Sequence, residues 1–510
     1  MIKCVKSGIA VLFSAMMLCI LTLVVGCFDQ IAFAGKRVFL LGQGTMLLCG
    51  MACLSVLAWI VMHRRTDSGV RRRDAWKRLL CWMVLFGTQL VLCFHAYFMP
   101  GWDVGAVLDA AYYAAGADVY INEGYFSMYP NNIPLVMFFS VIIRLLRFVL
   151  GSPGLDRCVF VIIAVQCLLN TFTGMLCSEI IRKETGSDGA ACFTAIVYSM
   201  FVGLSPWLMV PYSDSMVLVF PTLTLALYQR FRDRHWVWPV IGVVCALGYM
   251  IKPQAVIVFI AVVIVEFIRT MNGKTMGSWL RVTAGAALML VLVVFSGGHM
   301  LKSLAPMEIN PEKNMGMLHF AMMGLNTETN GVYSDEDVVF SATIGSAEER
   351  KTAQWQEIKK RLSVMSADDL LDHLKKKTLT NYADGTFAWG QEGNFFKQWI
   401  EDKDEHLSPF LKRIIHTDHE YYLILQTYCQ CIWLALLLGC LIYAVLTQSI
   451  QGEISCVVML SLLGLTAFEL IFEARARYLY LYAPFYITLG VQGIWMIIWR
   501  MRGKRDWMER

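Results

Sequence analysis

The chain has 510 residues, of which 57% are hydrophobic and 16% are charged, and its formal net charge at pH 7 is +5. A soluble protein of this length could not bury so much apolar surface, so the composition predicts a polytopic membrane protein. The basic residues form short clusters between apolar runs, as in cytoplasmic loops, and nucleic acid is therefore not an expected partner.

The first 99 residues contain three apolar runs and form the N-terminal group of predicted transmembrane helices. Residues 1–28 carry two lysines near their start, followed by an apolar run that ends at Cys27. This pattern is typical of either a lipoprotein signal or a first transmembrane helix. The many later apolar runs favour the helix. The run 38–62 is followed by the densest basic cluster, residues 64–78, which predicts a cytoplasmic loop. Residues 79–99 then cross outward.

Residues 100–156 form the first predicted outer loop, which reads GWDVGAVLDAAYYAAGADVYINEGYFSMYPNNIP from residue 101 to 134. Asp103 follows the third apolar run and is expected at the membrane surface. Residues 133–150 are apolar, but Ser140, Arg144 and Arg147 recur at helical spacing. This polar stripe predicts a helix that lies along the membrane interface and does not cross.

Residues 157–300 form the predicted transmembrane core, with six apolar runs at 158–180, 189–209, 215–228, 236–251, 255–267 and 279–300. If residues 133–150 do not cross, this count places the intervening basic residues on the cytoplasmic side. The fold class is thus an all-α polytopic membrane protein with about 12 transmembrane helices, and 13 are the alternative. Some of these runs are short for a crossing helix.

Residues 301–419 are the one long polar segment and are predicted to form an extracytoplasmic domain of helical or mixed structure. Ser366 is the expected N-cap of a helix there, with Asp368 and Asp369 in its first turn and Lys375 to Lys377 in its last. Residues 420–510 contain three further apolar runs and a basic tail. The protein is therefore expected in the plasma membrane, with both termini in the cytoplasm.

Five charged residues are predicted to meet at the outer face. Asp103 and Asp214 supply carboxylates, although Asp214 in Pro-Tyr-Ser-Asp also suits a helix N-cap. Lys252 lies within an apolar stretch, where a lysine is costly unless it pairs or reaches the surface. Arg475 and Arg477 stand at the outer end of the last run, where arginine is uncommon.

Two carboxylates and three cations at one membrane surface suit the displacement of a lipid phosphate from a sugar carbon. A carboxylate takes the proton from an acceptor hydroxyl, as a general base. Lysine and arginine hold the phosphate while its negative charge develops. The lipid tail of the donor would remain in the bilayer.

The sequence also resembles a Gram-positive group of integral membrane proteins related to the GT-C glycosyltransferases, the superfamily of the protein O-mannosyltransferases and the lipid A aminoarabinose transferase. The resemblance spans roughly residues 103–484 and depends on the order of several short motifs. These motifs are Trp-Asp at Asp103, Tyr-Pro-Asn-Asn at Tyr129, Tyr-Ser-Asp at Asp214, Lys-Pro at Lys252, His-Phe-Ala-Met-Met-Gly-Leu-Asn at His319, Asp-Gly-Thr-Phe-Ala-Trp at Asp384, and Arg-Tyr at Arg477.

The resemblance implies a GT-C-like fold, a polyprenyl-phosphate-sugar donor, and transfer with inversion on the outer face of the membrane. Asp103 would be the catalytic base and Asp214 the second acidic position, while Lys252, Arg475 and Arg477 would bind the donor phosphate. Many GT-C enzymes carry two adjacent acidic residues in the first loop, whereas Val104 follows Asp103 here. A bound divalent metal is therefore doubtful, and no cofactor is certain.

The acceptor is an unidentified glycan or protein. The candidates for contact with acceptor or sugar are Tyr129, Asn131, Asn132, His319, Asn326, Asp384 and Trp389. The last four could instead belong to the core and turns of the polar domain.

Two other functions fit the same sequence. A transporter or flippase for lipid-linked glycans would use Lys252 as a gate or substrate contact, but the internal repeat typical of transporters is not evident. A polysaccharide polymerase or ligase would depend on outer-loop arginines more than on Asp103.

Overall fold

The structure is a computed structural model that describes residues 2–27, 39–64, 74–270, 276–393, 397–398, 409–417, 419, 421–448 and 452–502. Within these ranges the only strands are β1 (Met99–Pro100) and β2 (Lys397–Gln398), which pair antiparallel. The predicted all-α class is therefore confirmed. Most of the basic cluster at 64–78 and of the basic tail lies outside the described residues.

Ten helices of the described chain are long and apolar enough to cross a membrane. They are built on α1 (Ile2–Gly26), α2 (Gln43–Arg64), α3 (Asp74–Ala96), α6 (Ile133–Leu150), α7 (Leu155–Thr185), α12 (Ile257–Thr270), α13 (Met276–Leu304), α20 (Tyr422–Leu446), α21 (Glu453–Ile471) and α22 (Ala483–Met501). Two shorter apolar helices, α8 (Asp188–Tyr198) with its π-helical extension and α11 (Val237–Ile251), accompany them. The chain is a multi-pass membrane protein, and the number of 12 spans stays a prediction.

The other described α-helices include the most polar ones. They are α4 (Trp102–Ala114), α5 (Glu123–Met128), α9 (Ser213–Val217), α10 (Val219–Phe231), α14 (Gly316–Gly324), α15 (Asp335–Ala342), α16 (Ala347–Val364), α17 (Ala367–Tyr382) and α19 (Pro409–Ile415). We call α14 to α17 the polar domain.

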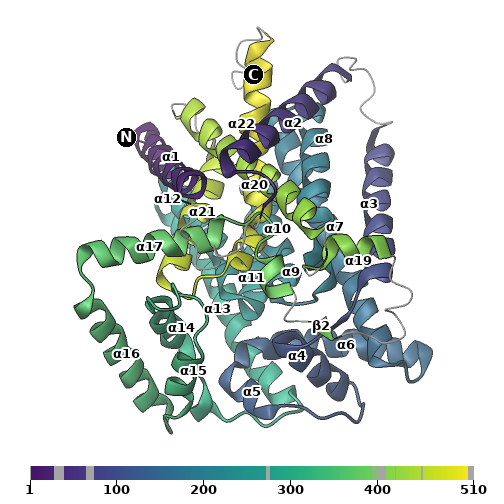
Figure 1. Cartoon of the computed structure of the whole chain (residues 1–510), viewed down its shortest axis with the longest axis vertical. Coiled ribbons are helices and arrows are strands. Elements are labelled where there is room, and N and C mark those ends of the chain that lie inside the picture. Colours follow the sequence, from purple (N-terminus) through teal and green to yellow (C-terminus); the bar gives the residue numbers. More distant parts are fainter. Residues whose placement is uncertain are drawn as a thin grey trace.

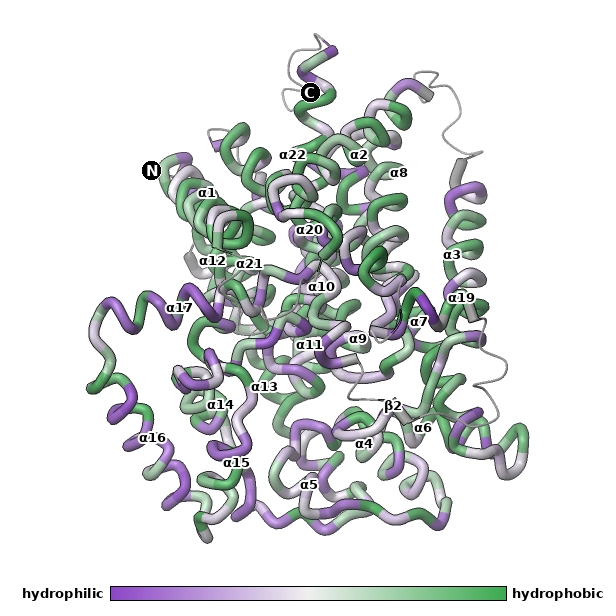
Figure 2. Tube along the Cα trace, viewed as in Figure 1, coloured by the Kyte–Doolittle hydropathy of each residue, from purple (hydrophilic) through white to green (hydrophobic). Residues whose placement is uncertain are grey.

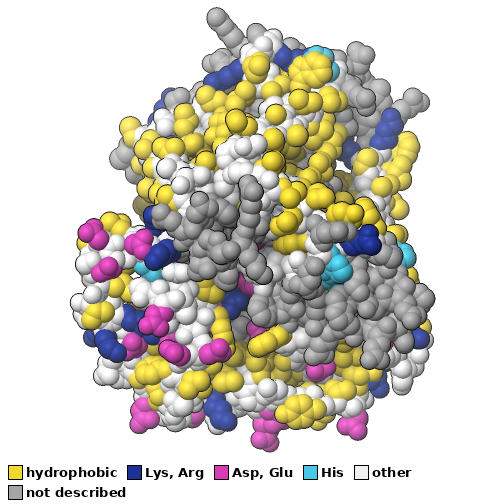
Figure 3. All heavy atoms as spheres, viewed as in Figure 1, with side chains coloured by type: hydrophobic (Ala, Val, Ile, Leu, Met, Phe, Trp, Pro, Cys, Tyr) yellow, Lys and Arg dark blue, Asp and Glu magenta, His cyan; other side chains and the backbone are white. Residues whose placement is uncertain are grey.

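The two termini lie at one end of the molecule, while α4, α5 and the polar domain lie at the other (Figure 1). Hydrophilic residues are concentrated along α15, α16 and α17, whereas the helices nearer the termini are mostly hydrophobic (Figure 2). Acidic side chains gather at the end away from the termini (Figure 3). Hydrophobic and hydrophilic residues are therefore concentrated toward opposite ends of the long axis.

Helix α6, which the sequence predicts to lie along the interface, is also long and apolar enough to be a candidate span. It packs against α4, and Arg144 donates through Nε and Nη2 to the carbonyl oxygen of Ala114 at the end of α4. Leu145 and Val149 are exposed on the side of the helix away from this stripe. The polar stripe of α6 thus faces the first loop, and its apolar side is free to contact lipid.

The polar domain docks on the end of α21 through Lys377. Ser366 caps α17 with a capping box, as predicted, but the helix continues to Tyr382, so the prediction that Lys375 to Lys377 form its last turn is wrong. The buried Lys377 ammonium donates to the carbonyl oxygens of Gly324, Leu470 and Phe472 at 2.8, 2.9 and 2.6 Å. One lysine therefore joins α14, α17 and the end of α21.

The centre of the bundle is formed by α20 and α22, which cross at closely packed glycines. A Cβ at Gly493 would lie 1.9 Å from the carbonyl oxygen of Gly439, and one at Gly439 would lie 2.3 Å from that of Gly490. Small residues let the two backbones approach, as is common between transmembrane helices. The contact fixes α22, which leads back to the segment carrying Arg475 and Arg477.

We predict that Gly493→Ala lowers the stability of the detergent-solubilised protein by about 1–3 kcal/mol, since the added methyl group must separate α20 from α22. Thermal unfolding monitored by size-exclusion chromatography measures the loss. Gly285→Ala in α13 is the matched control, because a Cβ there meets nothing within 4 Å. Equal stability of the two variants would contradict the close packing.

Candidate functional site

The predicted charged residues lie where helices are interrupted. Lys252 has an extended backbone (φ −148°, ψ 116°) between α11 and the 3₁₀ turn that opens at Pro253. Proline disfavours a helical conformation in the residue before it, so the Lys-Pro pair ends α11 at this point. Arg475 is also extended (φ −151°, ψ 125°) before the 3₁₀ helix η8 (Ala476–Tyr482), and Asp214 lies in the first turn of α9. Each break directs a charged side chain out of the helical packing.

Asp214, Lys252 and Arg477 form one buried ionic group, although they lie far apart in the sequence. The Lys252 ammonium is paired with Asp214 Oδ1, and the Arg477 guanidinium Nε lies 3.7 Å from Asp214 Oδ2. Only 3% of the Asp214 side chain and 7% of the other two are exposed. Such burial requires close pairing, because an isolated charge in the interior is costly.

Two glutamates that the sequence analysis gave no role complete this group. Arg475 donates from Nε to Glu473 Oε1 at 2.7 Å and from Nη1 to Glu392 Oε2 at 3.1 Å. Arg477 Nε also lies 3.1 Å from Glu392 Oε2. Together with Asp214 and Lys252 these four residues form what we call the charge cluster. Its three cations and three carboxylates give a formal charge of zero.

The signal for these glutamates in the sequence is weak. Glu473 opens the Glu-Ala-Arg-Ala-Arg-Tyr motif, and Glu392 follows the Asp-Gly-Thr-Phe-Ala-Trp motif by three residues. Burial raises the pKa of Glu473, but the guanidinium of Arg475 more than offsets it, so the pKa lies below its ordinary value. Burial lowers the pKa of Arg475, whereas Glu473 and Glu392 raise it to a net value above the ordinary one. The pairing of Glu473 with Arg475 therefore favours the charged form of both groups.

Aromatic rings cover the cations of the charge cluster. Lys252 Nζ lies 4.1 Å from the ring centroid of Tyr478, and the Arg477 guanidinium carbon lies 5.7 Å from that of Tyr212. Arg475 lies 5.8 Å from the ring of Tyr333. A cation over a ring face is attracted by the ring quadrupole, which helps to hold the charges in a dry environment.

Asp103 lies within electrostatic range of tyrosines that contact the charge cluster. It lies in the first turn of α4, directly after Trp102, whose backbone is left-handed (φ 51°), and the helix N-terminus favours its negative charge. Burial raises the pKa of Tyr212, and Asp103 is the next largest cause. Burial and Asp335 raise the pKa of Tyr333 to about 12, with a smaller contribution from Asp103. Asp103 is therefore within electrostatic range of two rings that contact the arginines.

The Tyr-Pro-Asn-Asn motif supports this arrangement. Asn132 donates from Nδ2 to the Tyr125 hydroxyl at 2.6 Å, and the Tyr212 hydroxyl donates to Asn132 Oδ1 at 3.4 Å. Burial raises the pKa of Tyr129, with Tyr333 and Asp103 as further causes. Asn131 is exposed. Asn132 thus links the first loop to α9, and Tyr129 lies beside the same tyrosines.

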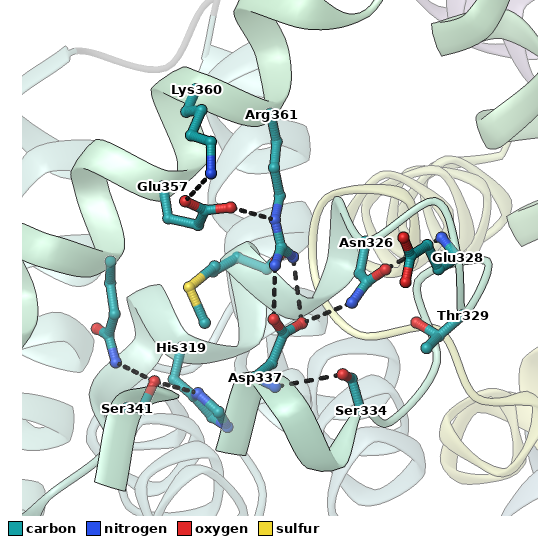
Figure 4. Close-up of polar contacts among 12 residues, drawn as sticks. His319, Asn326, Glu328, Thr329, Ser334, Asp337, Ser341, Glu357, Lys360 and Arg361 are labelled. Atoms are coloured by element: carbon teal, nitrogen blue, oxygen red, sulfur yellow. Dashed lines mark hydrogen bonds and ion pairs between the residues drawn. The ribbon is translucent and has the colours of Figure 1, made fainter. Parts of the chain in front are cut away.

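His319 and Asn326 connect the helices of the polar domain (Figure 4). His319 Nδ1 lies 2.9 Å from Ser341 Oγ, and Asn326 donates from Nδ2 to Asp337 Oδ2 at 3.1 Å. Arg361 of α16 binds the same aspartate. Among the described residues, neither His319 nor Asn326 has a hydrogen bond or ion pair with the charge cluster. Both side chains are buried in the polar domain, and their contact with an acceptor stays a prediction.

Asp384 and Trp389 are buried in a tight turn. Asp384 Oδ1 accepts from the backbone N–H and the hydroxyl of Thr386, and Trp389 Nε1 donates to the carbonyl oxygen of Ile415. Within the described chain no hydrogen bond or ion pair joins either residue to the charge cluster. The turn leads directly into the short π-helix η7 (Trp389–Gly393), which carries Glu392. The motif thus positions a glutamate of the cluster.

No group of three or more histidine, cysteine or acidic residues with an arrangement suited to a metal ion is found in the described chain. In the charge cluster each carboxylate is paired with a cation.

The model of a family described as "Conserved hypothetical integral membrane protein" matches residues 1–494. The chain belongs to this family. Membership agrees with the multi-pass helical structure and adds no activity to it. Neither a curated protein nor a solved structure matches the chain.

We predict that Lys252→Met destabilises the protein by about 3 kcal/mol, because it leaves the Asp214 carboxylate buried without its nearest cation. Thermal unfolding in detergent measures the loss. Adding Asp214→Asn to Lys252→Met is expected to restore part of the stability, since the unpaired charge is then removed. A single variant as stable as the wild-type protein would show that the pair is not a structural requirement.

Proposed function

We propose that the protein is a GT-C-type glycosyltransferase that moves a sugar from a polyprenyl-phosphate donor to an acceptor hydroxyl on the outer face of the cytoplasmic membrane. The observation that carries this proposal is the convergence of Asp214, Lys252, Arg475 and Arg477 in one cluster, with Asp103 within electrostatic range of its tyrosines. These are the residues that the resemblance assigns to base and phosphate binding. They come from four separate parts of the chain.

In the proposed reaction the acceptor oxygen attacks the anomeric carbon from the side opposite the phosphate. The new bond from this carbon to the acceptor oxygen forms as the bond to the phosphate oxygen breaks, which inverts the configuration. Asp103 takes the proton of the acceptor hydroxyl, as a general base. The electron pair of the broken bond leaves with the lipid phosphate.

Lys252, Arg475 and Arg477 would stabilise the charge on the leaving phosphate. Donors preorganised in a water-poor site stabilise developing charge more strongly than they do in bulk water. Arg475 Nη2 has no hydrogen-bond partner in the described part of the chain, and the Lys252 ammonium has one carboxylate partner. These groups have N–H bonds available for a phosphate oxygen. Asp214 would hold Lys252 and Arg477 in position.

The location of the charge cluster supports a donor with a lipid tail. Lys252 lies between the apolar helices α11 and α12, and Arg477 lies at the start of the apolar segment that ends with α22. Broken helices at membrane depth are tolerated where the backbone is buried in protein or lines a cavity. A phosphate bound there could keep its polyprenyl chain in the bilayer.

The first experiment is donor consumption by the purified protein in nanodiscs, with a panel of polyprenyl-phosphate sugars. We predict that the wild-type protein releases free polyprenyl phosphate and that Asp103→Asn lowers the rate by about 10²–10⁴-fold, because the general base is lost. Asp109→Asn, two turns along the same helix, is the matched control and should keep most of the rate. Equal activity of the Asp103 and Asp109 variants would remove Asp103 from the mechanism.

We predict that Arg475→Ala raises the donor KM about 10- to 100-fold, because one charge-assisted contact with the phosphate is lost. Initial rates over a range of donor concentrations measure this change. Lys360→Ala is the control, since Lys360 pairs with Glu357 on the exposed side of the polar domain. Unchanged donor saturation in Arg475→Ala would argue against phosphate binding at the cluster.

A further inference from the structure

Glu392 differs from the other carboxylates of the charge cluster in its side-chain contacts. A single oxygen, Oε2, lies 3.1 Å from both Arg475 Nη1 and Arg477 Nε. Its second oxygen has no side-chain partner in the described ranges. An anionic oxygen shared by two guanidinium groups is also how arginines bind a phosphate oxygen.

The other two carboxylates of the cluster are more firmly held. Glu473 is bound by Arg475 Nε at 2.7 Å and by the Tyr478 hydroxyl at 3.0 Å, and it precedes Arg475 by two residues in the chain. Asp214 is paired with Lys252 and Arg477 and is 3% exposed. Glu392 is 12% exposed, more than either. Of the three, Glu392 is the most exposed, and both of its side-chain contacts are with the arginines through one oxygen.

The backbone that carries Glu392 is strained. Phe387 and Ala388 have consecutive left-handed conformations, with φ of 55° and 60°, although neither is glycine. The π-helix η7 follows immediately, and a Cβ at Gly390 would lie 2.3 Å from the Tyr422 hydroxyl oxygen. Strained backbone and short π-helices occur preferentially at functional sites. Here both features lead into the segment that presents Glu392 to the arginines.

Glu392 determines the net charge that the cluster presents to a ligand. With Glu392 in place the three cations and three carboxylates balance, so the cluster offers a further anion no excess positive charge. When Glu392 leaves, the remaining residues carry a net charge of +1, and Arg475 Nη1 loses its hydrogen-bond acceptor. A phosphodiester, with one negative charge, would restore the balance.

We propose that Glu392 occupies the position of an anionic phosphate in the unloaded protein, and that a lipid-linked phosphate binds by displacing it from Arg475 and Arg477. This inference rests on the proposed function in taking the donor phosphate as the ligand. Glu392 is then a competing counter-ion that sets the affinity of the site. It also balances the charge of the cluster while no ligand is bound.

The test compares the binding of three probes to the full-length protein in detergent: farnesyl phosphate, farnesol and inorganic phosphate. Glu392→Gln keeps the shape of the side chain but removes its charge, so farnesyl phosphate should bind about tenfold more tightly, since no ionic contact has to be broken. Farnesol should bind equally to wild-type protein and variant. Tightening for farnesyl phosphate alone assigns the site to a lipid phosphate, and tightening for inorganic phosphate as well assigns it to the phosphate group itself.

Glu473→Gln is the matched control, because it removes the same charge from the same cluster. Glu473 orients Arg475 through Nε, so its loss should weaken the binding of farnesyl phosphate or leave it unchanged. If both variants bound farnesyl phosphate equally more tightly than the wild-type protein, only the net charge would matter. That result would overturn the proposal that the ligand displaces Glu392. Weaker binding to Glu392→Gln would also overturn it, since Glu392 would then support the arginines.

A structure of the wild-type protein with farnesyl phosphate decides the matter if Glu392→Gln does not fold. The phosphate should lie between Arg475 and Arg477, with the Glu392 carboxylate more than 4 Å from both, the limit for an ion pair. Retention of both Glu392 ion pairs beside a bound phosphate would overturn the proposal. Failure of farnesyl phosphate to bind the wild-type protein at all would instead count against the donor site of the proposed function.

Discussion

The buried pairing of Lys252 with Asp214 is the interaction on which the rest of this structure depends. Neither charge could remain at this depth alone, because an unpaired charge in a low-dielectric interior is strongly disfavoured. The pairing fixes the break between α11 and α12 against the start of α9. Arg477 then joins the same carboxylate and brings the segment before α22 to the same point.

The polar domain is part of this arrangement because it contacts the segment that carries the arginines. Lys377 binds the carbonyl oxygens at the end of α21, and the Ala474 N–H donates to the Gly331 carbonyl oxygen at 2.8 Å. The residue after Ala474 is Arg475. A movement of the domain would therefore be transmitted to a cation of the charge cluster.

The neutrality of the charge cluster changes how phosphate binding must be understood. Three cations at a membrane surface suggest a site that waits for an anion, but each of them has a carboxylate partner. In the proposed function, phosphate binding would be an exchange of anions, and its free energy would be the difference between two sets of ionic contacts. Such an exchange can be selective without leaving buried arginines unpaired.

The sequence by itself determined the class of protein and the ends of several elements. Composition required a membrane protein, because that class depends on total apolar surface. Pro253 ended α11 after Lys252, and Ser366 with Asp369 began α17, because both depend on local chemistry. The charged residues that meet could be named from their cost in apolar surroundings. Only the tertiary structure decided their partners. Glu392 joins two arginines more than 80 positions away, and His319 turns to Ser341 within its own domain, since such contacts depend on how distant segments pack.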